Sequence, residues 1–362
     1  MILRFHRAYS PNRALGGEIM QDTKLTNQST ANSQLGATPM QTTSSPEAIA
    51  FEQTISLHHD FKAVYAAIRE LLKYRGRTPK GLLLEGWPGT GKTAVAKKFH
   101  EHELLPTVPK ASPAKPMVYV NVALYSSTSQ VLSAILEELG DINPASGGLE
   151  RKEARVNVLL KKLDVQLLVI DEFQDLLPKQ QILPSSRIYR FLKGFLDKSG
   201  IPFLIIGLED TQRIFRADKQ LSSRFLPTQT IRKFSCLNKS EKLRFAVVIT
   251  GLLNSFPRKA PCLNFITQTT NSEGRTSLAL KDSHNDLYRF TLATGGTMRI
   301  LMNLLTKCIE ITEPHEIVDL KVLKVAYDKV VNSQLNANPF DTTTFALSRV
   351  KTKLKQEGLF NE

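Results

Sequence analysis

Long hydrophobic runs are missing from this chain of 362 residues. No apolar stretch approaches the ~20 consecutive residues of a membrane-spanning helix, so we expect no membrane insertion. Cysteine is also scarce: Cys236, Cys262 and Cys308 are odd in number and lack the spacing of metal ligands. We therefore expect buried thiols in a reducing compartment. No internal repeat is visible, and the length allows two domains plus tails.

Acidic residues are in the minority. The 48 Lys and Arg outnumber the 34 Asp and Glu, so the net charge is +14 and the isoelectric point is about 9.6. Such an excess favours a polyanionic partner. No amphipathic basic helix resembles a membrane anchor, and nucleic acid is therefore the expected partner.

A complete phosphate-binding loop runs from residue 86 to residue 93, with the sequence Gly-Trp-Pro-Gly-Thr-Gly-Lys-Thr. It matches G-x-x-x-x-G-K-[ST] between an apolar strand and a helical stretch, which favours a nucleotide site over an ordinary glycine-rich turn. Backbone N–H groups and the helix N-terminus would face the phosphates. Lys92 would neutralise the β- and γ-phosphates, and the Thr93 hydroxyl would hold Mg²⁺. The residues predicted to bind ATP here are Gly86, Trp87, Pro88, Gly89, Thr90, Gly91, Lys92, Thr93 and Ala94.

A second motif predicts that the nucleotide is hydrolysed. Residues 166–172, Gln-Leu-Leu-Val-Ile-Asp-Glu, form an apolar run that ends in two carboxylates. A run that is apolar on both faces suits a central strand of a parallel sheet, and ligands bind beyond the carboxyl ends of such strands. We expect Asp171 to support the Mg²⁺ shell and Glu172 to act as the general base on the attacking water.

Alternating strand and helix patterns predict a P-loop α/β domain with a central parallel sheet flanked by helices. After Ser240, a predicted N-cap, helical periodicity dominates and predicts a small helical lid. The expected strands are 117–122, 166–171, 202–207 and 228–234, and the expected helices begin near 55 and at 128, 150, 185, 240, 283, 297 and 315.

The two ends of the chain are polar. Residues 20–46 are rich in Gln, Thr, Ser and Asn, so we expect a disordered arm. Codons for Gly16, Gly17 and Glu18 can spell a bacterial ribosome-binding site, so we expect Met20 to be the natural start and 1–19 to be untranslated. The expected parts are a disordered arm at 1–50, an ATPase core at 51–236, a helical lid at 237–335 and a polar tail at 336–362.

These motifs together resemble the AAA+ ATPases. Beyond the two motifs above, Arg224 lies in Gln-Leu-Ser-Ser-Arg-Phe, and Arg299 lies in Gly-Gly-Thr-Met-Arg within the helical region. More narrowly, Asp-Glu-Phe-Gln at 171–174, together with segments 201–207 and 218–225, resembles the TnsC/TniB transposition regulators over roughly residues 50–335. The segment 118–121 is also similar to origin-binding initiator ATPases.

The resemblance implies roles for two arginines. Arg224 matches the arginine finger, which acts in trans in a neighbouring subunit's site; the alternative is a surface salt bridge. Arg299 matches the second sensor, which contacts nucleotide from the same chain; the alternative is a solvent-facing arginine. The chain departs from the family at Leu208, where a small polar residue often serves as the first sensor, and Glu209 or Asp210 could replace it.

Members of this family assemble on DNA as ATP-bound rings or filaments and connect a target-selecting protein to a transposase. The resemblance therefore implies largely sequence-independent contacts with double-stranded DNA and a bacterial cytoplasmic location. Two other functions stay open: a replication initiator or helicase loader, and a nucleotide-gated signalling switch. No winged-helix module follows the lid, which disfavours an origin-binding protein. The candidate DNA-contacting residues, each alternatively a solvated charge, are Arg151, Lys152, Arg155, Lys179 and Arg187.

Overall fold

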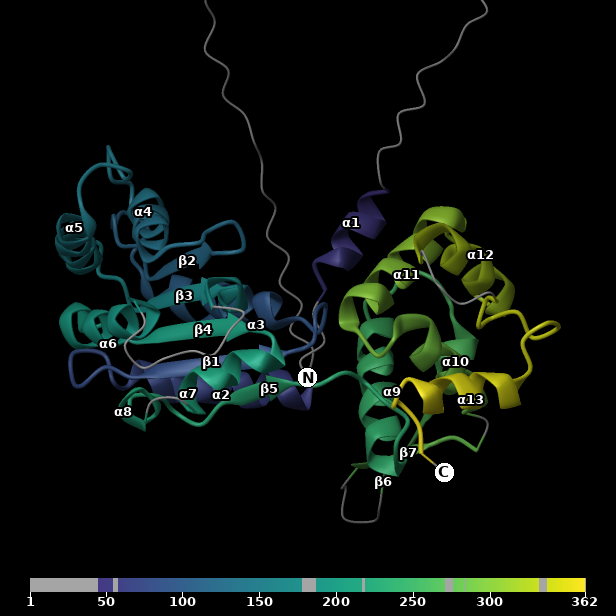
Figure 1. The fold of residues 1–362 in the computed structure, drawn as a ribbon. Helices are drawn as coiled ribbons and strands as arrows, with labels where there is room; N and C mark the ends of the chain where they lie inside the picture. Colours follow the sequence, from purple (N-terminus) through teal and green to yellow (C-terminus); the bar gives the residue numbers. More distant parts are fainter. Residues whose placement is uncertain are drawn as a thin grey trace, which may run out of the picture.

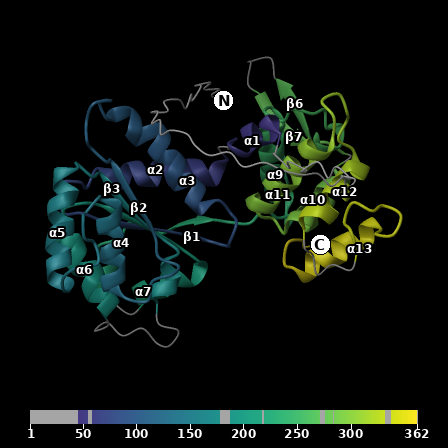
Figure 2. The ribbon, with the colours of Figure 1, turned by 90° about the horizontal axis from the view of Figure 1, so that it is seen from above.

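The computed structural model describes residues 45–54, 58–177, 187–216, 219–270, 276–282, 284–331 and 337–361. Figures 1 and 2 show a sheet-containing body, called the core here, beside a mainly helical body, the lid. Residues 1–44 lie outside the described part, so the disordered arm stays a prediction there. In the described ranges, no helix has both the length and the apolar character needed to cross a membrane.

The core is built on one five-stranded sheet in which every pair of neighbouring strands is parallel. Apolar runs form all of its strands except the short edge strand Gln229–Ile231, and the carboxyl ends of the strands meet at one edge of the sheet. This edge therefore carries both predicted nucleotide motifs. In spatial order the strands are β2 (Met117–Asn121), β3 (Leu167–Asp171), β4 (Phe203–Gly207), β1 (Gly81–Gly86) and β5 (Gln229–Ile231).

Helices cover both faces of the sheet, as the alternating pattern predicts. In β1, Leu82 and Leu84 pack with helices α2 (His59–Leu72) and α3 (Lys92–Phe99) on one face. Leu83 points the other way, toward the cluster that includes α4 (Thr128–Glu138), α5 (Leu149–Lys162) and α6 (Arg187–Ser199). The predicted fold class is confirmed. Shorter core elements are η1 (His100–Leu104), η2 (Leu105–Thr107), η3 (Phe173–Leu176), η4 (Glu209–Gln212), α7 (Arg213–Arg216) and α8 (Lys219–Ser222).

The lid has its own hydrophobic core and contains a hairpin that the sequence pattern did not reveal. Strands β6 (Ile266–Thr270) and β7 (Thr276–Leu280) pair antiparallel. Their Thr- and Ser-rich, largely exposed residues give little apolar alternation to detect. Asn238 rather than Ser240 is the N-cap of the first lid helix, because its side chain accepts from the Glu241 N–H at 2.9 Å. The helical elements are α9 (Lys239–Leu253), η5 (Pro261–Leu263), α10 (Asn285–Thr294), α11 (Met298–Ile311), α12 (Leu320–Val330) and α13 (Leu347–Gln356).

The first described helix, α1 (Pro46–Glu52), packs on the lid, contrary to the expected arm extending to residue 50. Phe51 is buried against Phe256, with ring centroids 5.3 Å apart. Arg258 and Glu47 form an ion pair at 2.7 Å. A helix is therefore present before the predicted boundary at residue 50, and it packs against residues some 200 positions later in the chain.

The expectation of a polar C-terminal tail also needs correction. Residues 337–361 include α13 and fold back onto the lid core. Polar residues dominate the segment, but its few large apolar side chains are buried. The backbone N–H of Cys236, in the connection from core to lid, donates to Leu359 O at 2.8 Å. The buried side chains of the segment are Phe340, Phe345, Val350, Leu354, Leu359 and Phe360.

Candidate functional site

The phosphate loop joins the end of β1 to the start of α3. Gly91 is the N-cap of α3 and has φ +101°, and Gly89 has φ +75°, a left-handed conformation that favours glycine. A Cβ added to Gly86 would lie only 2.3 Å from Ile231 O. The backbone of the loop therefore encloses a space that side chains would fill. The loop leads into the N-terminus of α3, the positive end of the helix, as a phosphate site requires.

Lys92, the first residue of α3, is buried inside this loop with 6% of its surface exposed. Its Nζ donates to Gly86 O at 2.8 Å and to Trp87 O at 2.9 Å. Burial lowers the pKa of Lys92, while the nearby carboxylates of Glu172 and Asp171 oppose that shift. The structure therefore brings the predicted phosphate-binding lysine together with both predicted acids.

Asp171 ends β3 and is 1% exposed. Its Oδ2 accepts from the Thr93 hydroxyl at 2.6 Å and from the Tyr119 hydroxyl at 2.7 Å. Its Oδ1 accepts from the Glu172 N–H at 2.8 Å. Thr93 and Asp171 thus present adjacent oxygens, the ligands that Mg²⁺ prefers, so the residues fit the predicted metal site.

Tyr119 is a site residue that the motif analysis missed. It lies on β2, which pairs with β3 in register, and strand alternation places it on the same face of the sheet as Asp171. Burial and the hydrogen bond to Asp171 raise the pKa of Tyr119 above its usual range. A tyrosine inside the otherwise apolar run Met-Val-Tyr-Val was the available signal.

Glu172 has an unusual backbone conformation. Its φ of +57° and ψ of 38° are left-handed, which costs a non-glycine residue about 1–2 kcal/mol. Its Oε2 accepts from Gln174 Nε2 at 2.7 Å. Backbone strain of this kind is common at functional sites, where contacts with the surrounding structure stabilise the strained conformation. The predicted general base is therefore held by both its backbone and its side chain.

Arg299 reaches the site from the lid. It is the second residue of α11, and its N–H donates to Gly89 O at 2.9 Å. Its exposed guanidinium contributes to lowering the pKa of Lys92. The predicted second sensor thus lies on the phosphate loop of its own chain.

Arg224 lies at the opposite end of β1. Its backbone O accepts from the Gly81 N–H at 2.9 Å, and β1 extends roughly 17 Å from Gly81 to the phosphate loop. Its guanidinium forms two contacts with the Asp197 carboxylate, at 3.2 and 3.1 Å. The arginine is therefore remote from the phosphate loop of its own chain and is engaged in a partly exposed ion pair.

The candidate DNA-contacting residues lie in different environments. Lys152 is 6% exposed, and its Nζ donates to Ser129 Oγ at 3.1 Å and Ser133 Oγ at 2.8 Å, between α4 and α5. Arg155 donates to Ser146 O at 2.9 Å and supports the loop before α5. Lys152 is thus a buried helix-to-helix contact, which corrects its prediction as a surface residue.

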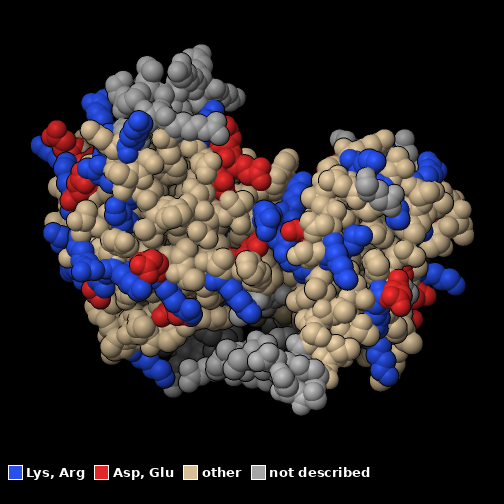
Figure 3. All heavy atoms as spheres, turned by 90° about the horizontal axis from the view of Figure 1, so that it is seen from below, with Lys and Arg blue, Asp and Glu red and all other residues tan. Residues whose placement is uncertain are grey.

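Arg151 is exposed on α5 and stays a candidate. Lys179 lies outside the described residues. Arg187 begins α6, with its side chain outside the described part. Figure 3 shows basic side chains spread over both core and lid on the face in view, with fewer acidic ones between them.

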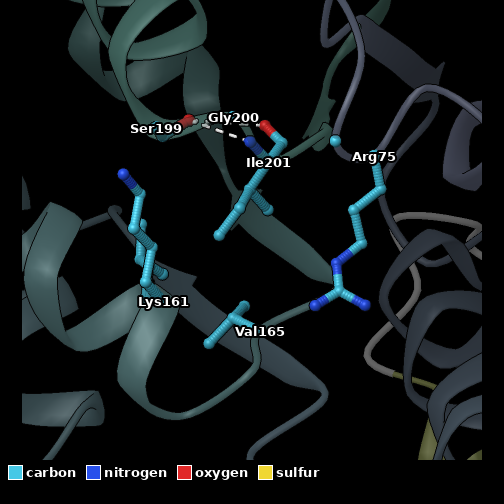
Figure 4. Close-up of a pocket in the computed structure, with 8 residues that line it drawn as sticks. Arg75, Lys161, Val165, Ser199, Gly200 and Ile201 are labelled. Atoms are coloured by element: carbon cyan, nitrogen blue, oxygen red, sulfur yellow. Dashed lines mark hydrogen bonds between the residues drawn. The ribbon is translucent and has the colours of Figure 1, made fainter.

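A separate pocket of about 470 Å³ lies at the edge of the sheet away from the phosphate loop. It is lined by residues that precede β1, β3 and β4. Arg75 and Lys161 lie on opposite sides of it, with Val165 and Ile201 between them (Figure 4). Arg75 is paired with Asp164. The pocket shares no residue with the motifs described above, so it is distinct from the nucleotide site.

Solved structures with similar folds include proteins of the ORC type. The Aeropyrum pernix ORC2 protein in its ADPNP-ADP complexes has a TM-score of 0.51 and 15% identity, over 76% of this chain and 68% of that one. Its ADP form has a TM-score of 0.50 and 15% identity, over 76% and 69%. This likeness, with the parallel sheet order, confirms the AAA+ fold. No curated protein matches the sequence. The family model of the bacterial TniB protein matches residues 47–234, just over half of the chain, and the chain therefore belongs to the TniB family.

Proposed function

We propose that this protein is an ATP-dependent transposition regulator. It assembles on double-stranded DNA and connects a target-selecting protein to a transposase. Membership of the TniB family supports the role in transposition. The observation that carries the ATPase assignment is the gathering of Lys92, Thr93, Asp171 and Glu172 at one edge of the sheet, with Arg299 against the same loop.

The site residues divide the chemistry of ATP hydrolysis among them. Lys92 exchanges its two loop carbonyls for phosphate oxygens, which its charge stabilises. Thr93 and Asp171 would hold Mg²⁺, which would neutralise charge on the phosphates. Glu172 accepts a proton from the attacking water. Arg299 contacts the nucleotide from the lid, so bound ATP would connect the lid to the core. The ADPNP-ADP complexes of the ORC2 protein support a nucleotide site in this fold.

Assembly of several copies would complete the site. Arg224 lies too far from its own phosphate loop to act there, and this distance supports action in a neighbouring copy. There it would offset charge on the transferring phosphoryl group. Its ion pair with Asp197 is half exposed and would be exchanged at the subunit interface. A ring or filament of like copies follows from such head-to-tail contacts.

The DNA role rests on charge. A net charge of +14 supports contacts with phosphates, which bind duplex DNA without reading bases. A replication initiator or helicase loader is the second candidate function, because the fold resembles the ORC2 protein. Competition between unrelated duplexes separates the two: an origin-binding initiator prefers one sequence, whereas the regulator binds them equally.

The substitution Glu172→Gln tests the proposal. The amide keeps the shape of the side chain but accepts no proton, so ATP should bind without turnover and ATP-dependent DNA complexes should persist. Trp87, the only tryptophan in the chain, lies in the phosphate loop with Lys233 Nζ 3.8 Å from its ring centroid. Its fluorescence would report binding, and phosphate release would report hydrolysis.

Lys92→Ala is the matched loss-of-binding variant, and Lys98→Ala on the same helix is its control. Removing the Lys92 ammonium leaves triphosphate charge uncompensated, so the fluorescence response to ATP should disappear. Wild-type turnover by Glu172→Gln would eliminate Glu172 as the base. A wild-type protein that bound neither ATP nor duplex DNA would overturn the proposed function.

A further inference from the structure

Among the described residues that follow β4, no side chain donates a hydrogen bond to Glu172. Leu208, which follows Gly207 directly, is apolar. Glu209 is exposed, and a carboxylate offers no donor to a second carboxylate. Asp210 pairs with Arg213 at 3.2 Å, and Thr211 is fully buried beside Gly207.

Gln174 provides a direct link. This residue lies in the η3 turn, two positions after Glu172. Its Nε2 donates to Glu172 Oε2 at 2.7 Å, and its Oε1 accepts from the Leu208 N–H at 3.2 Å. Both partners fix the orientation of the amide, because a backbone N–H only donates and a carboxylate only accepts. One side chain thus bridges the end of β4 and the base.

We propose that Gln174 is a positioning residue for Glu172, whose carboxylate it connects to the backbone at the end of β4. This inference rests on the proposed function, in which Glu172 is the base. A glutamate side chain has several rotatable bonds, and a charge-assisted hydrogen bond restricts them. Because Gln174 engages Oε2, the other carboxylate oxygen is left to take the proton. Displacement of the end of β4 would move Gln174 and, with it, the carboxylate.

Two substitutions that keep a side chain of similar length distinguish the positioning of Glu172 from simple support of the η3 turn. Gln174→Met removes the donor and the acceptor together. Gln174→Glu keeps an acceptor for the Leu208 N–H but places a second carboxylate beside Glu172. Two carboxylates this close repel each other, so the second variant should displace the Glu172 side chain. A residue that only braced the turn would tolerate this change without loss of kcat.

The experiment measures kcat and KM of the full chain, with ATP binding followed by Trp87 fluorescence. For Gln174→Met we expect kcat to fall about 10-fold or more, the range of one hydrogen bond to a charged group, while KM stays near the wild-type value. For Gln174→Glu we expect kcat to fall as well, again with KM near the wild-type value. Asp175→Asn is the control: this neighbour is exposed, and its substitution should change neither quantity.

Two results would overturn the inference while leaving the ATPase intact. One is a wild-type kcat in both Gln174→Met and Gln174→Glu, when Glu172→Gln is inactive. The other is a rise in KM equal to the fall in kcat/KM, which would assign Gln174 to binding. Active Glu172→Gln would instead show that the proposed base is wrong, so the two failures are distinguishable. Circular dichroism confirms that the variants are folded.

Discussion

His58 is a buried histidine at the junction of core and lid. It is 5% exposed, and its ring lies 4.4 Å from that of Phe61 and 5.5 Å from that of Phe234, centroid to centroid. Burial lowers the pKa of His58 to about 4, with Arg244 and His59 adding to the shift and Asp60 opposing it. A neutral imidazole is therefore part of the folded protein near neutral pH.

This burial predicts a loss of stability in acid. The pKa of His58 is about 4 in the fold and 6.5 in the unfolded chain, so protons bind the unfolded state preferentially. The stabilisation is present above pH 6.5 and is lost as the pH falls toward 4, by up to about 3 kcal/mol. Urea unfolding at pH 7.5, 5.5 and 4.5 measures it. His58→Phe should flatten this dependence, the exposed His59→Gln should not, and identical pH curves for wild type and His58→Phe would contradict the assignment.

At the scale of elements, the pairing of α4 with α5 depends on Lys152. Replacing this residue with Ala removes a buried ammonium and leaves two serines without their donor. We expect the free energy of unfolding to fall by about 1–3 kcal/mol, with no change in how DNA binding depends on salt.

The neighbouring Arg151 provides the opposite test, because it is exposed on the same helix. If it neutralises one phosphate, Arg151→Ala should reduce the slope of log affinity against log salt by about 0.9 and leave stability unchanged. Filter binding over a salt series, with chemical denaturation alongside, checks both variants. An unchanged slope for Arg151→Ala would place the DNA surface elsewhere.

Elements that form from neighbouring residues could be predicted from the sequence, whereas elements that depend on contacts with residues far along the chain could not. Strand β3 was predicted at 166–171 and spans 167–171, because a continuous apolar run is a local signal. Helix α1 was missed because its support, the ion pair between Glu47 and Arg258, comes from far along the chain. The hairpin β6–β7 lacks a local apolar alternation, and helix α13 has only three large apolar residues among its ten.

The same distinction applies inside the site. Lys92, Thr93 and Asp171 were predictable, since the chemistry of phosphate and Mg²⁺ fixes their residue types and spacing. Gln174 belongs to the Asp-Glu-Phe-Gln segment that carries the family resemblance, but its contact with Leu208 was not predictable, because that contact depends on where the end of β4 comes to lie. Lys152 looked like a surface charge because sequence periodicity does not reveal which helix packs above it.

At the scale of the whole molecule, the position of Arg224 predicts that ATP is hydrolysed by assembled copies and not by an isolated subunit. Arg224→Ala should leave ATP affinity of the isolated subunit nearly intact and remove turnover in the assembly. Mixing this variant with Lys92→Ala should restore part of the activity, because one interface type then pairs an intact loop with an intact arginine. No recovery, together with equal loss of activity in dilute monomer, would place Arg224 in its own subunit's site.

The docking of α1 on the lid has a consequence for the order in which a ribosome produces this protein. All five strands of the core sheet are complete once Ile231 has been made. Helix α1, although synthesised first, must wait for Phe256 and Arg258, and the lid core waits for Phe360. At ~5–20 residues per second, the interval from Ile231 to Phe360 lasts about 6–26 s. During those seconds a folded sheet would carry an undocked apolar helix ahead of it and a growing, unfinished lid behind it, which is when binding by a chaperone would matter most.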